Sequence, residues 1–262
     1  MFWYARCSIQ ILPRSGSRPT QKIMNEHFAY LAINLASLSV PLLRSFDKRV
    51  QYVKRWPYLF ASMSIVGAVF LIWDIIFTHF GIWGFNPRYL SGISLFNLPL
   101  GEWLFFFVIP YSSIFIYEVF KYFTPWQRWS WGVKGASFLQ WASWALAAFN
   151  YDKWYTVITF SLLGTFLWFA QNRLKLKWGL LWVSYAVALI PFFVVNGLLT
   201  GSWISEEIVW YNDAENLGIR LGTIPFEDVF YGMLLIFSNI AIMEWLETRS
   251  TSKGVSISHE DH

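Results

Sequence analysis

The sequence predicts an all-α membrane protein with about seven transmembrane helices, arranged as two parallel three-helix repeats joined by a connector helix. Three observations lead to this fold. Of the 262 residues, 56% are hydrophobic and only 14% are charged, whereas ordinary soluble domains are about 25% charged. Apolar stretches of roughly membrane-spanning length recur along the chain. One pattern of residues also occurs twice, at a constant interval of 126 positions.

Seven apolar stretches are the candidate transmembrane helices, because about 20 apolar residues in a helix cross the core of a bilayer. They lie at residues 28–43, 58–80, 103–123, 136–149, 154–171, 178–199 and 229–247. The first and fourth are short, and the fourth could instead be a re-entrant or interfacial helix. Aromatic residues make up 21% of the chain, and the Trp and Tyr among them suit the two interfaces of a membrane.

A loop that carries a carboxylate occurs twice, each time before an apolar helix. The copies are "FNPRYLSGISLFNLPLGEW", which starts at Phe85, and "YNDAENLGIRLGTIPFEDV", which starts at Tyr211. The matched pairs at the interval of 126 are Asn86 and Asn212, Gly92 and Gly218, Pro99 and Pro225, Glu102 and Asp228, and Glu118 and Glu244. The first three apolar stretches then correspond to the last three, so both repeats have one orientation in the membrane. Sites in such folds tend to lie at the repeat interface.

The repeats divide the chain into five parts. These are an N-terminal extension at 1–23, the first repeat at 24–135, the connector helix at 136–153, the second repeat at 154–248 and a polar tail at 249–262. The extension, whose apolar stretch is short and interrupted by basic residues, and the polar tail are both expected to be disordered. Met24 stands directly before the first apolar stretch, and the native protein is expected to begin there.

Basic residues are concentrated in alternate loops, which predicts the sidedness of the protein. The loop after the first stretch, "RSFDKRVQYVKRW", is strongly basic, while acids such as Glu206, Glu207 and Asp213 lie in loops of the other set. The positive-inside rule therefore predicts an integral protein of the cytoplasmic (inner) membrane, with the N-terminus outside and the C-terminus in the cytoplasm. Both carboxylate loops would face outward.

Composition excludes several kinds of site. Cys7 is the only cysteine, so an internal disulfide and a Cys-based metal cluster are ruled out. The four His are scattered, and no metal site is expected. The sequence has no Gly-rich phosphate loop and no nucleophile elbow, so no cofactor is expected. The net charge of +4 follows from membrane topology and does not indicate a nucleic-acid partner.

Acids stand at the start of two predicted helices. The first copy of the motif has Pro99 and Glu102, and the second has Pro225, Glu227 and Asp228. A structural role explains one copy alone, because Pro suits the first turn of a helix and acids there complement the helix dipole. However, the motif occurs twice and borders the apolar interior, where carboxylates are costly and often functional.

Further acids lie within the apolar stretches. Glu118 and Glu244 fall near the cytoplasmic ends, where anchoring is the expected role, whereas Asp74 lies on the side of the motif loops. A carboxyl in apolar surroundings has a raised pKa, because burial disfavours the charged form, and it can act as a general acid. Aromatic side chains could stabilise a cation by their π faces. An acid with an aromatic box suggests carbocation chemistry on a hydrocarbon dissolved in the membrane.

The residues expected to bind substrate are aromatic residues near the acids, together with the Asn and Pro of the two motif loops. It comprises Trp73, Trp83, Asn86, Pro99, Trp103, Tyr211, Asn212 and Pro225. The two Asn are expected mainly to shape the loops, although an amide could orient a carboxyl.

Two segments of the chain carry a resemblance to a known family. "WDIIFTHFGIWGFNPRYLSGISLFNLPLGEWLFFFVIPYSSIFIYE" resembles the first half of the membrane-integral lycopene cyclases, which occur as two small subunits or as their fusion in bacteria, archaea and fungi. "WYNDAENLGIRLGTIPFEDVFYGMLLIFSNIAIMEWLE" resembles the second half, and the match covers roughly residues 24–248. Its most specific feature is the doubled Pro-x-acid-acid motif. The second copy is intact, but Gly101 stands in the first where the family has Glu.

The resemblance implies an isomerase (an intramolecular lyase) of carotenoid biosynthesis, a lycopene β-cyclase. It would convert the acyclic ends of lycopene to β-ionone rings, giving γ- and then β-carotene without net redox change. A protonated carboxyl would protonate the terminal double bond, a second double bond would attack the tertiary cation, and a carboxylate would remove a ring proton. The expected acid–base set is Glu102, Glu227 and Asp228, with Asp74 in support.

The same resemblance implies the partners. Lycopene and membrane lipid are expected, while contacts with other enzymes of the pathway or with a second copy of the chain are left open.

Other functions of a membrane protein with this topology fit less well. A retinal photoreceptor needs a Lys in its last helix, and "VFYGMLLIFSNIAIMEWLE" has none. A membrane prenyltransferase would need aspartate-rich metal-binding motifs, which the sequence lacks. Two alternatives stay open: a non-catalytic carotenoid-binding protein, which the loss of an acid at Gly101 would allow, and a small transporter that uses paired acids as a proton relay.

Overall fold

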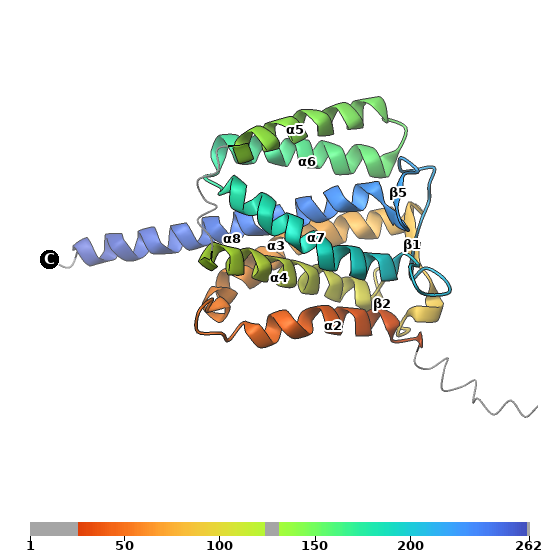
Figure 1. The fold of residues 1–262 in the computed structure, drawn as a ribbon, viewed down its shortest axis with the longest axis horizontal. Coiled ribbons are helices and arrows are strands. Elements are labelled where there is room, and N and C mark those ends of the chain that lie inside the picture. The colour runs from red at the N-terminus through yellow and green to blue at the C-terminus, as the bar shows by residue number, and fades with distance from the viewer. Residues whose placement is uncertain (1–25, 124–130, 261–262) are drawn as a thin grey trace, which may run out of the picture.

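The structure, a computed structural model, describes residues 26–123 and 131–260. Helices make up most of this part of the chain (Figure 1). They are α2 (Ala29–Arg44), α3 (Trp56–His79), α4 (Leu100–Phe123), α5 (Trp131–Phe149), α6 (Trp154–Arg173), α7 (Trp178–Leu199) and α8 (Phe226–Glu260). Each contains one of the seven predicted apolar stretches or nearly all of it. The predicted extension at 1–23 lies outside the described residues, and α8 continues as a helix through most of 249–262, where the sequence predicts disorder.

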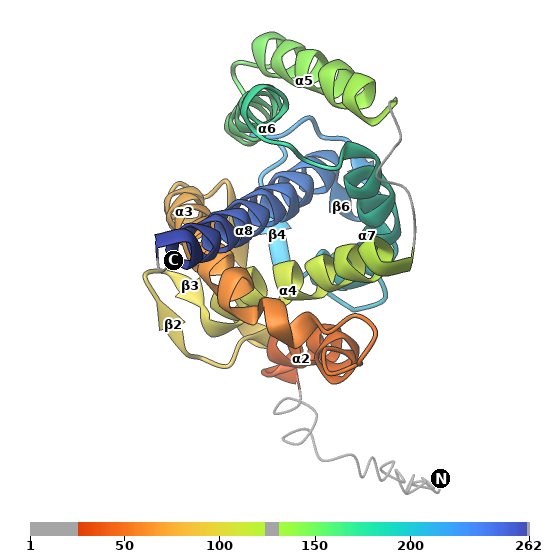
Figure 2. The same ribbon diagram turned by 90° about the vertical axis from the view of Figure 1, so that its left-hand side faces the viewer.

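The most apolar helices form the centre of the bundle. Among the described residues, four segments are long and apolar enough to cross a membrane: Tyr52–His79, Leu100–Phe123, Trp178–Leu199 and Phe226–Ser250. They correspond to α3, α4, α7 and α8, which surround the middle of the molecule when it is viewed along its length (Figure 2). The α2 helix packs on α4, and α5 and α6 pair beside α8. This architecture confirms an all-α membrane protein, while the number of helices that span the bilayer stays a prediction.

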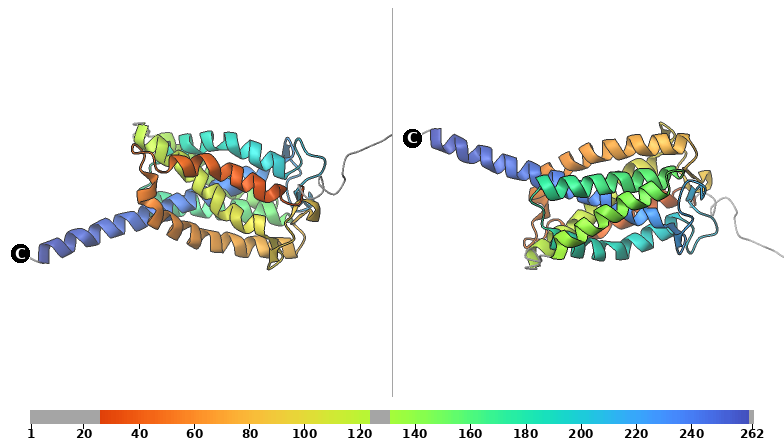
Figure 3. Two further views of the ribbon diagram at one scale, coloured as in Figure 1. Left: turned by 90° about the horizontal axis from the view of Figure 1, so that it is seen from below. Right: turned by 90° about the horizontal axis from the view of Figure 1, so that it is seen from above.

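Short strands gather at one end of the bundle (Figures 1 and 3). They are β1 (Trp83–Phe85), β2 (Ser94–Leu95), β3 (Leu98–Pro99), β4 (Val209–Tyr211), β5 (Arg220–Leu221) and β6 (Ile224–Pro225). The β2–β3 and β5–β6 pairs are hairpins, each of which leads directly into a helix, and β1 pairs with β4 across the two halves of the chain. All three pairings are antiparallel.

The strands repeat with the interval found in the sequence. Each strand of the first half has a counterpart 126 residues later, so that β1 matches β4, β2 matches β5 and β3 matches β6. In the β1–β4 ladder, Gly84 pairs with Trp210, and these two residues are themselves one repeat apart. The helices α4 and α8 both begin at the strand end (Figure 1). The structure thus confirms the internal repeat, with both copies running in the same direction.

Ion pairs join helices near the end of the bundle opposite the strands. Arg55 contacts Glu118 at 3.1 Å and Glu247 at 2.8 Å, and Lys121 contacts Glu244 at 3.3 Å. The matched acids Glu118 and Glu244 therefore tie α4 and α8 to basic residues, in agreement with the anchoring role that the sequence predicts for them.

Candidate active site

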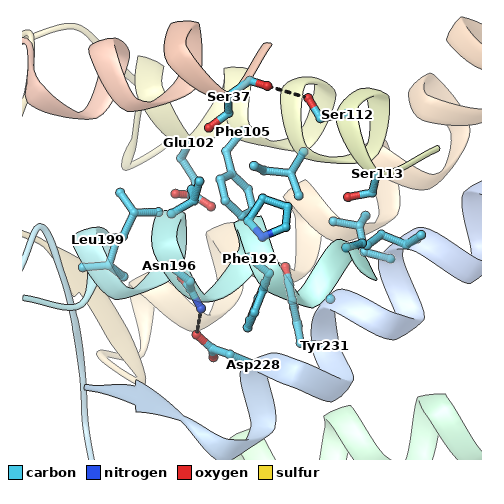
Figure 4. Close-up of a pocket in the computed structure, with 18 of the residues that line it drawn as sticks. Ser37, Glu102, Phe105, Ser112, Ser113, Phe192, Asn196, Leu199, Asp228 and Tyr231 are labelled. Carbon is cyan, nitrogen blue, oxygen red and sulfur yellow. Dashed lines mark hydrogen bonds between the residues drawn. The ribbon is translucent and has the colours of Figure 1, made fainter. Parts of the chain in front are cut away.

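A single cavity collects the acids of both repeats. It lies among α3, α4, α7 and α8 beneath the β1–β4 ladder, and its volume is about 1100 Å³ including the open mouth. In the described part of the chain, three carboxyl groups line it: Asp74 of α3, Glu102 of α4 and Asp228 of α8. Their exposed fractions are 1%, 8% and 4%. Figure 4 shows Glu102 and Asp228 on opposite sides of the space, with apolar side chains around them.

The hairpins set the positions of Glu102 and Asp228. Each hairpin ends in a proline, and the next residue donates its backbone N–H back across the hairpin: Leu100 to the Ile93 carbonyl and Phe226 to the Ile219 carbonyl, both at 2.9 Å. Glu102 and Asp228 therefore stand in the first turns of α4 and α8. Unpaired backbone N–H groups at a helix start favour negative charge, so this position suits a carboxylate.

Asp74 and Glu102 form a close carboxyl pair. The Trp83 indole Nε1 donates to Asp74 Oδ1 at 2.5 Å, and the Tyr30 hydroxyl donates to Glu102 Oε2. The other oxygen of Asp74, Oδ2, is buried without a donor, and both carboxyl groups line the same cavity. A carboxyl oxygen buried without a donor costs least when its group carries a proton, so these two acids suit the storage of a proton.

Asp228 has different surroundings. Its Oδ1 accepts a hydrogen bond from the Tyr155 hydroxyl at 2.5 Å, and its Oδ2 accepts from Asn196 Nδ2 at 2.7 Å and from the Tyr211 hydroxyl at 2.9 Å. Burial and the neighbouring Asp228 raise the pKa of Tyr211, which lies in β4, so its hydroxyl keeps the proton that it donates. Hydrogen bonds from two hydroxyl groups and one amide stabilise the charged form of Asp228.

Glu227 does not line the cavity, although it is the residue next to Asp228. Its side chain is fully buried, where Oε1 accepts hydrogen bonds from Thr156 Oγ1 at 2.6 Å and from the Leu217 backbone N–H at 2.8 Å. Consecutive helical residues point about 100° apart, which explains why the two acids have separate environments. Glu227 joins α8 to α6 and to the preceding loop.

Aromatic rings form the wall beside the carboxyl groups. The Trp83 ring lies 5.1 Å from Tyr155, 6.1 Å from Tyr211 and 6.2 Å from Tyr231, measured between ring centroids. All four residues line the cavity. A cation within about 6 Å of such ring faces is stabilised electrostatically.

Two of the aromatic residues predicted to bind substrate lie outside the cavity lining. Trp73 packs its ring 4.9 Å from that of Tyr231 and thus supports the wall from behind. Trp103 donates from Nε1 to the Leu95 carbonyl at 3.2 Å and fastens α4 to the β2–β3 hairpin. Trp83 and Tyr211, in contrast, line the cavity as the sequence predicts.

The two Asn and two Pro of the predicted set shape the loops. The Asn86 side chain accepts from the Arg88 backbone N–H, and the Asn212 side chain accepts from the Ala214 backbone N–H, both at 3.1 Å. Pro99 and Pro225 are the last residues of β3 and β6 and are buried. None of the four lines the cavity, so they position the acids from outside it.

Several contributors to the site lack a signal in the sequence. Tyr30, Tyr155, Asn196 and Tyr231 line the cavity and lie on α2, α6, α7 and α8. Each sits inside an apolar stretch, where a Tyr or Asn resembles an ordinary interface or packing residue. The repeat interval alone points to one of them: the position one repeat before Thr156, the partner of Glu227, is Tyr30.

The arrangement can move a proton within an apolar, aromatic space. One carboxyl pair can supply the proton, a separate carboxylate can receive one, and aromatic faces can stabilise positive charge between them. The described residues contain no group of three or more His, Cys, Asp or Glu that could hold a metal ion. The carboxyl groups and the aromatic wall equip the site for acid–base chemistry on an apolar molecule.

Comparison with known proteins identifies the chain. The family model described as lycopene cyclase matches residues 27–120 and 152–246, which together make up more than half of the sequence and correspond to the two repeats. Comparisons with curated proteins and with solved structures give no match. The match to the family model extends over α2 to α4 and over α6 to α8, and it includes all three carboxyl groups that line the cavity. The chain therefore belongs to the lycopene cyclase family.

Proposed function

We propose that the protein is a lycopene β-cyclase, which converts the acyclic ends of lycopene into β-ionone rings through γ-carotene to β-carotene. The observation that carries this proposal is the convergence of Asp74, Glu102 and Asp228 on one aromatic cavity in a chain of the lycopene cyclase family. A polyene has no polar handle, so an apolar cavity with acids at one end suits it.

The Asp74–Glu102 pair is the proton donor of this mechanism. A proton from one of these two carboxyl groups adds to the terminal double bond of the polyene and leaves a tertiary cation on the neighbouring carbon. Tyr30 and Trp83 hold the two carboxyl groups in place through their hydrogen bonds. Holding donor and acceptor in a fixed geometry is a large part of the rate enhancement in such steps.

Ring closure follows when another double bond of the chain attacks the cation. The new carbon–carbon bond closes the six-membered ring and moves the positive charge onto a ring carbon. Tyr155, Tyr211 and Tyr231 line this region, and their rings lie close together. They stabilise the cation without offering it a lone pair as a base would, which favours cyclisation over capture.

Asp228 is the base that ends the reaction. Its three hydrogen-bond donors favour the carboxylate, which removes a ring proton and leaves the ring double bond. One proton is consumed and one is released, so the reaction is an isomerisation with no net redox change. The proton then returns from Asp228 to the donor pair before the next turnover. The choice of the ring proton that is removed determines where the ring double bond lies, and in this proposal it gives the β ring.

The proposed setting is the cytoplasmic membrane, with the strand end of the bundle outside and the C-terminus in the cytoplasm. This orientation is supported by the basic loops at the end opposite the strands, in accordance with the positive-inside rule. Lycopene would enter from the lipid, since the walls of the cavity are mostly apolar.

Expression in a bacterium that accumulates lycopene tests the proposal directly. Chromatography of the pigments is expected to show γ- and β-carotene in cells with the wild-type chain and lycopene alone in cells with an empty vector. A binding protein or a transporter would leave lycopene unconverted at the same protein level. Glu207→Gln, which changes an exposed loop acid, serves as the variant with unchanged activity.

A further inference from the structure

The acid missing from the first motif copy has a structural counterpart on another helix. At the repeat interval, Gly101 matches Glu227 and Tyr30 matches Thr156. The contacts follow the same matching: Thr156 Oγ1 donates to Glu227 Oε1 at 2.6 Å, and in the first repeat the Tyr30 ring lies against Gly101. In the second repeat the small Thr156 faces the acid Glu227. In the first repeat the large Tyr30 faces Gly101 at the matching positions.

The Tyr30 ring fills the space that a side chain at position 101 would need. A Cβ atom added to Gly101 would lie 2.6 Å from Cδ1 and 2.7 Å from Cγ of Tyr30, which is closer than real atoms approach. The ring cannot easily move away, because Tyr30 is only 2% exposed and stacks on Phe85 with centroids 6.4 Å apart. An acid at position 101 is therefore incompatible with Tyr30.

The hydroxyl of Tyr30 gives this exchange a chemical consequence. It donates to Glu102 Oε2, so the residue that displaces the missing acid also holds the remaining one. Asn34 fixes the arrangement from the same helix: its Nδ2 donates to the Gly101 carbonyl at 3.0 Å and to the Tyr30 carbonyl at 3.1 Å. In this way α2 is fastened to the first turn of α4, where Glu102 stands.

We propose that Tyr30 is a positioning residue that takes the place of the acid missing at Gly101 and orients Glu102 for proton transfer. The inference rests on the proposed cyclase function for its catalytic part. Its steric part, the mutual dependence of Tyr30 and Gly101, stands on packing alone. According to this proposal, the first motif copy still positions an acid, because the loss of one carboxyl at Gly101 is accompanied by a Tyr that binds the other.

Tyr30→Phe tests the catalytic part, because it removes the hydroxyl and keeps the ring. Ring formation in lycopene-accumulating cells is expected to fall about tenfold or more, the range for a lost hydrogen bond to a charged group, with a changed pH profile for the purified protein. Tyr52→Phe is the matched control, since Tyr52 is also buried but donates to the Tyr111 backbone carbonyl at 3.0 Å. Equal activity and equal pH profiles for the two variants would overturn the positioning role.

Gly101→Glu with and without Tyr30→Thr tests the steric part. Gly101→Glu alone is expected to lower the melting temperature of the purified protein and to reduce ring formation. Adding Tyr30→Thr, which copies the Thr156–Glu227 pair, is expected to restore the melting temperature and to recover at least part of the activity. A double variant no more stable than Gly101→Glu alone, or a single Gly101→Glu variant as stable as wild type, would refute the exchange.

The two readouts separate this inference from the proposed function. If the wild-type chain leaves lycopene unconverted, the cyclase assignment fails, and the melting temperatures still decide whether Tyr30 and Gly101 depend on each other. If the wild-type chain forms rings and Tyr30→Phe does so equally well, the cyclase assignment stands and the positioning role is wrong.

Discussion

Gly84 and Trp210 lie opposite each other in the β1–β4 ladder, and they are separated by one repeat interval in the chain. The Trp210 ring lies against Gly84 so closely that a Cβ atom there would overlap it. This pair is the central one of the three residue pairs through which the strands of the two halves meet. A change at Gly84 therefore acts on the junction of both repeats.

Gly84→Ala is expected to destabilise the protein by about 1 kcal/mol, the low end of the cost of overpacking, because the added methyl group must displace a Trp210 ring that is 39% exposed. Gly67→Ala in α3 is the control, because a Cβ atom at Gly67 would meet nothing within 4 Å and Ala favours a helix. Thermal unfolding in detergent compares the two variants. If Gly84→Ala unfolds at the same temperature as Gly67→Ala, the close approach of Trp210 does not matter for stability.

Removal of either principal acid is expected to abolish most of the activity. General acid–base catalysis contributes about 10²–10⁴-fold to a rate, so Glu102→Gln and Asp228→Asn are each expected to lower ring formation by that factor. Both substitutions keep the size of the side chain. The measurement is the ratio of cyclic to acyclic carotenoid at matched protein level. Near-wild-type β-carotene from either variant would move the chemistry to another residue.

Glu227→Gln is expected to have a smaller effect than Asp228→Asn. Glu227 is buried away from the cavity and accepts hydrogen bonds from Thr156 and Leu217, so its loss weakens the support of α8 but removes no reacting group. The expected sign is a lowered melting temperature with a modest loss of ring formation. A loss as large as that of Asp228→Asn, in a protein of unchanged stability, would show that Glu227 takes part in the chemistry.

The position of both matched acids in one cavity predicts the order of products. Because the matched acids Glu102 and Asp228 line one space, each chain is expected to cyclise one end of the polyene at a time. A time course with limiting enzyme should show monocyclic γ-carotene before bicyclic β-carotene. The appearance of β-carotene without any monocyclic precursor would indicate that both ends react in one binding event.

The orientation in the membrane can be tested with reporter fusions. A reporter that works only in the periplasm, fused after Glu247, is expected to be silent, while one that works only in the cytoplasm should be active. A periplasmic signal from that fusion would invert the topology and place the strand end of the bundle in the cytoplasm. The ratio of the two signals at equal expression gives the answer.

The helices were predictable because their signal is spread over many residues. The predicted stretches at 58–80 and 178–199 differ from α3 and α7 by no more than two residues at either end, since long apolar runs leave few alternatives in a membrane. The repeat was predictable from matched turn residues such as Gly92 and Gly218, both of which adopt positive φ angles, 79° and 69°. Glycine is favoured there because it carries no Cβ.

The candidate site was only partly predictable, because its partners come from different helices. The acids stand out in an apolar sequence, but nothing local shows that Tyr155 reaches Asp228 or that Trp83 reaches Asp74. Likewise, adjacency in the sequence suggests that Glu227 and Asp228 act together, whereas the turn of the helix gives them different neighbours. Packing between helices decides these contacts, and periodicity along one helix does not contain that information.

The β1–β4 ladder joins the two halves of one chain, so the covalent link between α4 and α5 affects how readily the ladder forms. If the chain were cut between α4 and α5, the two pieces would have to meet through helix packing, such as that of α3 on α8, and through strand addition of β1 to β4, with main-chain hydrogen bonds formed between separate polypeptides. In the intact chain, the linking segment acts as a tether that gives each half a high effective concentration of the other. Assembly of the cavity within one chain is therefore expected not to depend on how abundant the protein is in the membrane.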